Sequence, residues 1–233
     1  MPLRYILALI LAAILPAASA YADSVTRSVG GVDFDFVVPK GHCVLEDSNS
    51  QDAKFITVIS TLFKKASNTL VVATAKCDAR ARLRSGDVSR LNSYAAYYVP
   101  DAWVNTTLDG DKSALRKELC NEMRKQGQEV LSDVKDLVAK AAKELNSNIG
   151  VTSTKLIGVL GEDNHGCYTG LLIGAKGADG TVTMVSSIVT STVIRSKGLF
   201  LAYYNDYAGP ETTEAGVKVS KATAAELDQK NPD

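Results

Sequence analysis

The amino-acid sequence predicts an α+β domain, a mainly antiparallel sheet with one long and two shorter helices packed on it and two disulfides. Residues 181–194 are dense in β-branched side chains, and an aromatic run returns at 199–204, which predicts two long paired strands. Residues 111–145 instead keep a 3.6-residue apolar period, typical of a helix. Because several strands follow one another in the last third, an antiparallel meander is favoured over a parallel sheet.

The first 22 residues have the three parts of a secretory signal peptide. Arg4 precedes an apolar run over 5–15, and small residues at 18–20 offer a cleavage site before Tyr21, with a second before Asp23. The apolar run is shorter than the roughly 20 residues that a spanning helix needs. We therefore expect export to the periplasm or secretion, a single globular domain over 23–233, and no integral membrane segment after removal of 1–22.

The charge balance argues against nucleic acid as a partner. The chain has 26 Lys and Arg against 26 Asp and Glu, and loss of Arg4 with the signal leaves 25 against 26, a net charge of about −1. Nucleic-acid binding is expected from a clustered excess of Lys and Arg.

The four cysteines lie in the predicted mature part, at positions 43, 77, 120 and 167. An even count in an exported chain predicts two disulfides, and three connectivities are open. We favour Cys43 with Cys77 and Cys120 with Cys167, because each bond would tie elements that are neighbours in the predicted order.

The first half alternates strands and helices. Residues 32–38 alternate apolar and acidic side chains, which predicts a half-exposed strand with Asp33 and Asp35 facing water. Apolar residues recur at spacings of three and four over 52–66, as one helical face requires. Strands are then predicted over 70–75 and 94–99.

The second half begins with the long helix over 111–145, which Gly127 can interrupt. Strands follow over 152–160 and 167–173, and a four-residue turn at 195–198 joins the two long strands. The chain closes with a weaker helix over 211–229.

This order of elements resembles that of Mog1/PsbP-like proteins. The matching features are an early strand and turn over 34–41 (FDFVVPKG), a late turn and aromatic strand over 196–200 (SKGLF), and the closing helix. The four cysteines and the helix over 111–145 do not map onto that family. The resemblance implies a protein-binding or assembly-accessory role without catalytic residues.

Two groups of side chains are candidate binding surfaces. Arg80, Arg82 and Arg84 alternate, so on an extended segment they would form a row that binds an anionic ligand or an acidic partner; a solvated strand face is the alternative. Tyr203 and Tyr204, with the tyrosine at 207, could line a groove on a sheet face, although packing between sheet and helix explains them equally well.

Each histidine stands next to a cysteine, as His42-Cys43 and as His165-Gly166-Cys167. Two imidazoles and two thiolates would make a zinc or copper site if these loops met. The alternative is that the cysteines are oxidised and the histidines are loop residues, which we favour because no short metal-ligand spacing is present.

No catalytic motif for a serine hydrolase, zinc protease, P-loop NTPase or dinucleotide-binding enzyme occurs in the sequence. We therefore expect a non-enzymatic accessory or interaction module of the cell envelope, without a cofactor, that binds a protein partner or a small anionic ligand. The alternatives are a periplasmic protein that binds a small ligand or a metal, and a hydrolase that uses paired carboxylates.

Overall fold

The computed structural model describes residues 24–126 and 134–232, so the predicted signal segment 1–22 lies outside the described residues. The strands of the described part are β1 (Ser24–Val29), β2 (Val32–Val37), β3 (His42–Val44), β4 (Asn68–Lys76), β5 (Ser93–Pro100), β6 (Gly150–Asp163), β7 (Gly166–Lys176), β8 (Val182–Ile194) and β9 (Lys197–Asp206). The helices are α1 (Ser50–Lys65), α2 (Cys77–Ser85), α3 (Lys112–Gln126), α5 (Val134–Glu144) and α6 (Pro210–Lys230), with a 3₁₀ turn η1 (Asp101–Trp103). The predicted α+β class is confirmed.

Seven of the strands form one antiparallel sheet in the order β3-β4-β5-β9-β8-β7-β6. The predicted meander is confirmed, because β6, β7, β8 and β9 pair with one another in sequence order. Strand β9 then pairs with β5, which joins the meander to the first half of the chain. Strands β1 and β2 form a separate hairpin.

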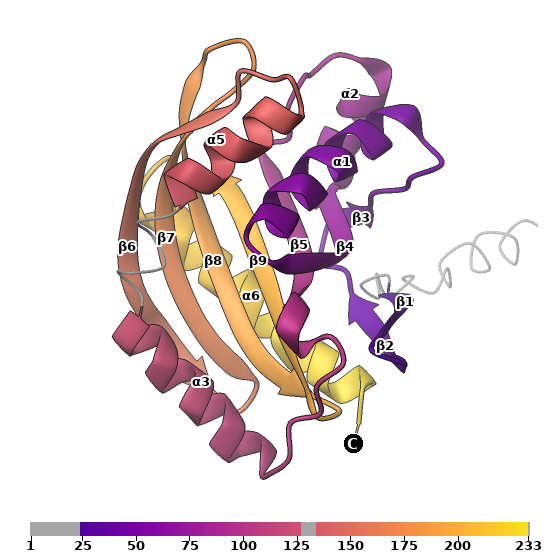
Figure 1. Cartoon of the computed structure of the whole chain (residues 1–233), viewed down its shortest axis with the longest axis vertical. Coiled ribbons are helices and arrows are strands. Elements are labelled where there is room, and N and C mark those ends of the chain that lie inside the picture. Colours follow the sequence, from indigo (N-terminus) through magenta and orange to yellow (C-terminus); the bar gives the residue numbers. More distant parts are fainter. Residues whose placement is uncertain (1–23, 127–133, 233) are drawn as a thin grey trace, which may run out of the picture.

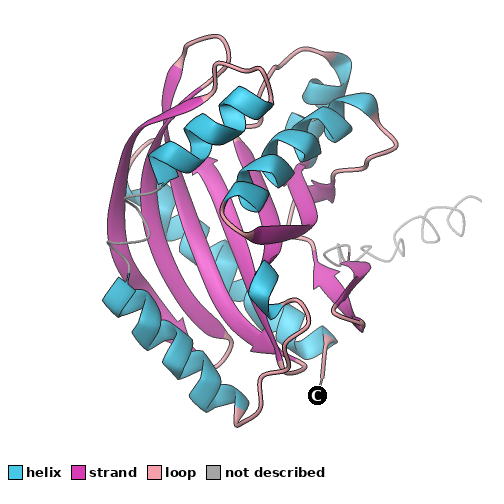
Figure 2. Cartoon of the chain, viewed as in Figure 1, coloured by secondary structure: helices cyan, strands magenta, loops and turns pink. Residues whose placement is uncertain are grey.

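Helices cover both faces of the sheet (Figure 1; Figure 2). Helices α1 and α5 lie side by side on one face, and α3 crosses that face near the other end of the strands. Helix α6 runs along the opposite face, where the β1–β2 hairpin packs beside its C-terminal part. The sheet is therefore the middle layer of three.

The main hydrophobic core lies on the α6 side of the sheet. Phe34 and Phe36 of β2 are fully buried there with Tyr97 of β5 and Leu227 of α6. The ring centroids of Phe36 and Tyr97 are 4.9 Å apart, and the Tyr97 hydroxyl donates to the Val37 carbonyl oxygen at 2.7 Å. Each of these side chains contributes roughly 2 kcal/mol through burial, so the hairpin belongs to the core.

Two of the two-residue hairpin turns are formed by residues in the left-handed conformation. Gly30 and Gly31, with φ of 55° and 79°, join β1 to β2, and a side chain at Gly30 would collide with the Val104 carbonyl oxygen. Arg195 and Ser196, with φ of 46° and 58°, join β8 to β9. The predicted four-residue turn over 195–198 was therefore wrong, since β9 already begins at Lys197.

The helices differ from the prediction in number, because the described residues contain five α-helices where three were expected. In place of one helix over 111–145 there are α3 and α5, and Gly127 lies outside the described residues. Helix α2 was not predicted, and neither was strand β1.

Candidate functional site

A mostly apolar pocket of about 410 Å³ lies between α1, α5 and the sheet. Helix α1 contributes Phe55, Leu62 and Phe63 to its wall, and α5 contributes Leu137 and Val138. All five side chains remain partly exposed to solvent. Partly exposed apolar groups around a concave space are typical of a ligand site, because a fully packed core would remove them from water.

The local sequence of α1 explains why its apolar side chains line this pocket. They recur at spacings of three and four, which places them on one face of the helix. The Asn49 side chain caps the N-terminus by accepting hydrogen bonds from the backbone N–H groups of Gln51 and Asp52 at 3.1 and 3.2 Å. Lys64 and Lys65 in the last turn complement the helix dipole. The helix is thus defined at both ends, with its apolar face toward the sheet.

Tyrosine rings form part of the pocket floor. Tyr94 of β5 stacks on Tyr204 of β9 with ring centroids 4.4 Å apart, and its edge meets Phe55 of α1 at 5.2 Å. Tyr98 of β5 packs against Phe63 of α1 with centroids 4.6 Å apart. These aromatic contacts hold the floor against the helix, so the pocket has a rigid wall.

The tyrosine hydroxyls of the floor are neutral donors. Burial raises the pKa of Tyr94 and of Tyr98 well above the ordinary value of 10.0. Burial raises the pKa of Tyr204 to about 12, an effect that the neighbouring Ser187 hydroxyl partly offsets. Among the described residues no hydrogen bond reaches the hydroxyl of Tyr94 or Tyr98. Both groups therefore keep a donor for a bound molecule.

A larger hollow, about 800 Å³, lies near the start of α3 and the Arg195 turn, but its charged residues are already engaged. Arg195 donates to the carbonyl oxygens of Asp33 and Pro232 at 2.7 and 3.1 Å. Lys112 pairs with Asp228 at 2.7 Å. The tyrosine-lined pocket is the better candidate, because the hydroxyl groups of Tyr94 and Tyr98 are not used by the described part of the protein itself.

The structure separates the three tyrosines that the sequence grouped as groove candidates. Tyr204 lies in the pocket floor. Tyr203 faces the opposite side, where it is buried in the main core beside Gly216 of α6. Tyr207 follows the end of β9 and is partly exposed, outside the residues that line the pocket. Only alternate residues of a strand share a face, so a single groove built from Tyr203 and Tyr204 is not available.

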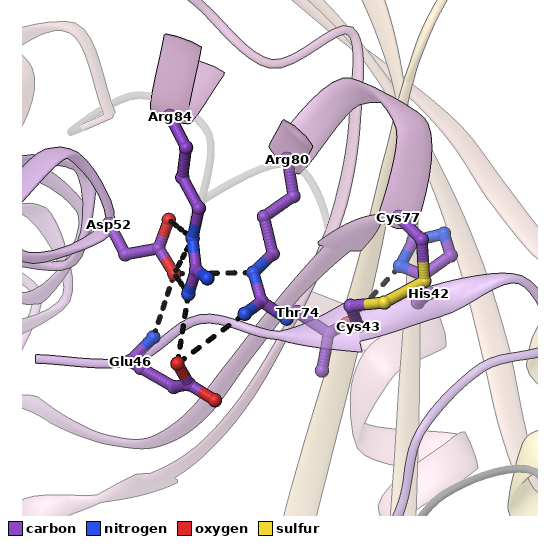
Figure 3. Close-up of a disulfide and its surroundings, with 8 residues drawn as sticks. All are labelled: His42, Cys43, Glu46, Asp52, Thr74, Cys77, Arg80 and Arg84. Carbon is purple, nitrogen blue, oxygen red and sulfur yellow. Dashed lines mark hydrogen bonds and ion pairs between the residues drawn. A yellow bond between two sulfur atoms is a disulfide. The ribbon is translucent and has the colours of Figure 1, made fainter. Parts of the chain in front are cut away.

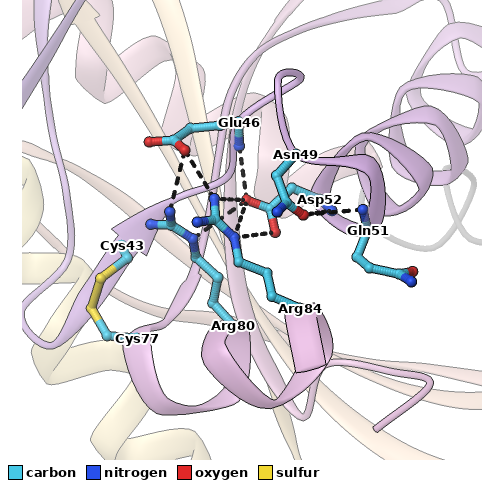
Figure 4. Close-up of polar contacts among 8 residues, drawn as sticks. All are labelled: Cys43, Glu46, Asn49, Gln51, Asp52, Cys77, Arg80 and Arg84. Atoms are coloured by element: carbon cyan, nitrogen blue, oxygen red, sulfur yellow. Dashed lines mark hydrogen bonds and ion pairs between the residues drawn. A yellow bond between two sulfur atoms is a disulfide. The ribbon is translucent and has the colours of Figure 1, made fainter. Parts of the chain in front are cut away.

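Arg80, Arg82 and Arg84 lie on helix α2, so the prediction of an extended row was wrong. On a helix the first and third share a face, and both reach Glu46 and Asp52 (Figure 4). Nη2 of Arg84 is 2.5 Å from Asp52 and 2.9 Å from Glu46. The Arg82 side chain is exposed. Two of the three guanidiniums are thus held within the protein, and anion binding at this helix stays a prediction.

Asp52 is the centre of this cluster and is fully buried at the start of α1. Burial alone would raise the pKa of Asp52, but hydrogen bonds from Arg84 and from the Glu46 backbone N–H, with the charges of Arg84 and Arg80, hold it below its usual value. The buried carboxylate is therefore ionised and depends on the two arginines for compensation.

Both predicted disulfides are confirmed, with the favoured pairing. Cys43–Cys77 joins β3 to the first residue of α2 (Figure 3), and Cys120–Cys167 joins α3 to β7. The two sulfur atoms that the zinc or copper site would need, those of Cys43 and Cys167, are each bonded to another cysteine. Residues 24–126 and 134–232 contain no group of three or more His, Cys, Asp or Glu that could hold a metal ion.

The two histidines lie in different surroundings. His42 is buried in β3, where Nδ1 is 3.2 Å from the Thr74 hydroxyl (Figure 3). The His42 ring also packs against Tyr203. His165 follows β6, and its Nδ1 is 2.9 Å from Asp228 of α6. Each imidazole thus has its own contacts, and none is shared.

His42 should make the protein less stable as the pH falls below neutral. Burial, helped by the charge of Lys76, lowers the pKa of His42 from 6.5 to about 4. The unfolded chain then binds the proton first, so stability is full above pH 6.5 and declines as the pH falls toward 4. This group should cost about 2 kcal/mol between pH 7 and pH 5. Urea titration of wild type and His42→Gln at both pH values measures it.

The matched control is His165→Gln, which removes the partly exposed histidine. We expect only His42→Gln to reduce the difference in unfolding free energy between the two pH values. An undiminished difference in His42→Gln would show that this imidazole is not the group that titrates.

Buried charges were missed by sequence reasoning, among them Asp52 and Arg116. Arg116 of α3 is 6% exposed and donates to the Val193 carbonyl oxygen at 2.8 Å and to Asp228 at 2.9 Å. This arginine, together with Lys112 and His165, holds the pKa of the half-buried Asp228 at about 2 despite the opposing effect of burial. Nothing in the local sequence marks it, because its partners come from distant elements.

Comparison with known proteins supports only a weak likeness of fold. No family model and no curated protein matches the chain. Among solved structures it is similar to cyanobacterial PsbP (CyanoP) from Synechocystis sp. PCC 6803, with 11% identity over 88% of this chain and 93% of that chain and a TM-score of 0.36. It is also similar to a mutant of the protein Mog1, with 11% identity over 89% and 92% and a TM-score of 0.26. The weak resemblance expected from the sequence is confirmed at this level.

Proposed function

We propose that this chain is a non-enzymatic extracytoplasmic binding protein that holds a small, mainly apolar ligand between α1, α5 and the sheet. The observation that carries the proposal is the pocket of about 410 Å³ with partly exposed aromatic and aliphatic walls. Small-molecule sites commonly occupy roughly 300 to 1,000 Å³. A ligand that covers these walls gains roughly 25 cal/mol for each Å² of apolar surface removed from water.

The proposed location rests on two features that belong together. Two disulfides are typical of an oxidising compartment, and residues 1–22 have the composition of a secretory signal. No helix within residues 24–126 and 134–232 is long and apolar enough to cross a membrane. These features support a periplasmic or secreted protein.

The pocket favours a small apolar ligand over an anionic ligand or an acidic protein partner. Lys176 is the only charged residue among the described residues that line it. At α2, Arg80 and Arg84 already compensate Asp52 and Glu46, so an anionic partner there would compete with existing ion pairs. An apolar ligand in the pocket would not have to displace an existing ion pair.

Titration with N-phenyl-1-naphthylamine, a neutral probe that fluoresces in apolar surroundings, tests the proposal. We expect saturable binding that Ala175→Phe weakens at least tenfold, because the new ring occupies the pocket floor. Ala139→Phe makes the same change at an exposed position of α5 and should bind like the wild type. Native mass spectrometry of the purified protein would also reveal a ligand that stays bound.

The proposal fails if the probe does not saturate. It also fails if Ala175→Phe, shown by its melting temperature to be folded, binds the probe as well as Ala139→Phe does.

A further inference from the structure

The pocket floor continues past Tyr204 into a row of buried hydroxyl groups. Ser187 of β8 pairs directly with Tyr204 of β9, so the two side chains share a face of the sheet. Ser191 lies four positions further along β8 on the same face, and Thr169 of β7 lies opposite the residue midway between them. This hydroxyl row, Ser187, Ser191 and Thr169, leads from the pocket toward the Cys120–Cys167 disulfide.

The side chains of the hydroxyl row make no well-aligned hydrogen bond within the protein. Ser187 and Ser191 are 1% exposed and Thr169 is 6% exposed. None of the three side-chain oxygens has a partner in good hydrogen-bond geometry, although the Ser187 hydroxyl lies close enough to Tyr204 to lower the pKa of that tyrosine. Buried hydroxyls are nearly always paired, because water can no longer compensate them. The three hydroxyls of the row therefore keep hydrogen-bonding capacity that a bound molecule can use.

We propose that the ligand is a small neutral amphipathic molecule, with an apolar body in the pocket and one hydroxyl or carbonyl group hydrogen-bonded to Ser187. This inference rests on the proposed function and adds the chemical class of the ligand. Ser187 is the first member of the row because it adjoins Tyr204, which already lines the pocket. Ser191 and Thr169 extend the hydroxyl row beyond Ser187.

Charge excludes an ionic head group at this position. The hydroxyl row contains no charged side chain, and among the described pocket residues only Lys176, at the exposed end of β7, carries a charge. A carboxylate or ammonium buried beside hydroxyls alone would lose its hydration without a counter-charge. A neutral hydroxyl or carbonyl group loses far less hydration free energy on burial and can form a hydrogen bond with a serine.

Competition with N-phenyl-1-naphthylamine separates these head groups. Decan-1-ol, decanoate and decylammonium carry the same apolar chain, and we expect decan-1-ol to displace the probe at the lowest concentration. Ser187→Ala should weaken decan-1-ol about fivefold by removing one hydrogen bond, once the displacement is corrected for the variant's own affinity for the probe. Its thermal stability should fall little, because the deleted hydroxyl makes no well-aligned hydrogen bond in the free protein.

Thr190→Val is the matched control. Thr190 lies on the same strand, is 1% exposed and also has an unpartnered hydroxyl, but faces the α6 side of the sheet. We expect it to bind decan-1-ol like the wild type. The proposed ligand class is wrong if the three compounds displace the probe equally, or if Ser187→Ala binds decan-1-ol as tightly as the wild type does. Neither result would contradict the proposal that the pocket binds an apolar ligand. If the probe itself does not bind, both the proposed ligand site and the proposed ligand class are overturned.

Discussion

Replacing Cys120 and Cys167 together by alanine should lower the free energy of unfolding by about 4 kcal/mol. The bond closes a loop with a sequence separation of 47, and its loss frees the unfolded chain to adopt many more conformations. Denaturant titration under oxidising conditions measures the loss.

Hydrogen exchange adds a local test of the same bond. Because Cys120–Cys167 ties α3 to β7, backbone amides of α3 should exchange faster in the double variant. The variant without Cys43 and Cys77 should lose similar global stability, since that separation is 34, while α3 keeps its protection relative to global unfolding. Unaltered protection of α3 in both variants would show that the bond does not anchor this helix.

The second large effect concerns Arg84, whose replacement by glutamine should cost about 3 kcal/mol. Removing one partner of a buried pair leaves a charge without compensation, and Asp52 is fully buried. Arg80, whose Nε is 3.3 Å from Asp52, keeps the loss below the upper end of the usual range. Urea titration at pH 7 measures it.

Arg82→Gln is the control, because this residue lies on the same helix with an exposed side chain. Its stability should stay within about 0.5 kcal/mol of the wild type. Adding Asp52→Asn to Arg84→Gln should recover part of the loss, because the uncompensated charge is gone. If Arg82→Gln and Arg84→Gln lower the free energy of unfolding by similar amounts, the pair of Arg84 with buried Asp52 is not the cause of the loss in Arg84→Gln.

The strands were predictable because their pattern is local. The β-branched run of β8 and the aromatic run of β9 carry their structure in adjacent residues, and both appear where expected. The disulfide pairing followed from the order of elements. The class of fold needed no knowledge of distant contacts.

Helix α2 was missed because its sequence does not show a helical period. Leu83 is the one buried residue of this helix, and the alternating arginines have the period of a strand. What favours the helix is distant in sequence: Asp52 and Glu46 meet two of the arginines, and Gly86 with φ of 84° ends the helix. A local sequence pattern cannot predict ion pairs between residues so far apart in the chain.

The candidate pocket was predictable only in part. The apolar face of α1 was evident, yet a sequence pattern cannot tell a packed face from one that lines a cavity. The floor combines Tyr94 with Tyr204, which come from different halves of the chain. The hydroxyl row is equally hidden, since serines on a strand ordinarily indicate a solvated face.

The β5–β9 ladder sets the order in which this chain can fold. Strands β6 to β9 pair with their sequence neighbours, so these hairpins close short loops and can form early. Pairing of Tyr94 with Tyr204 must wait until the two halves of the chain meet, which makes that ladder a slow, entropically costly step. The pocket floor straddles this ladder, so a binding-competent pocket exists only after this long-range pairing is complete.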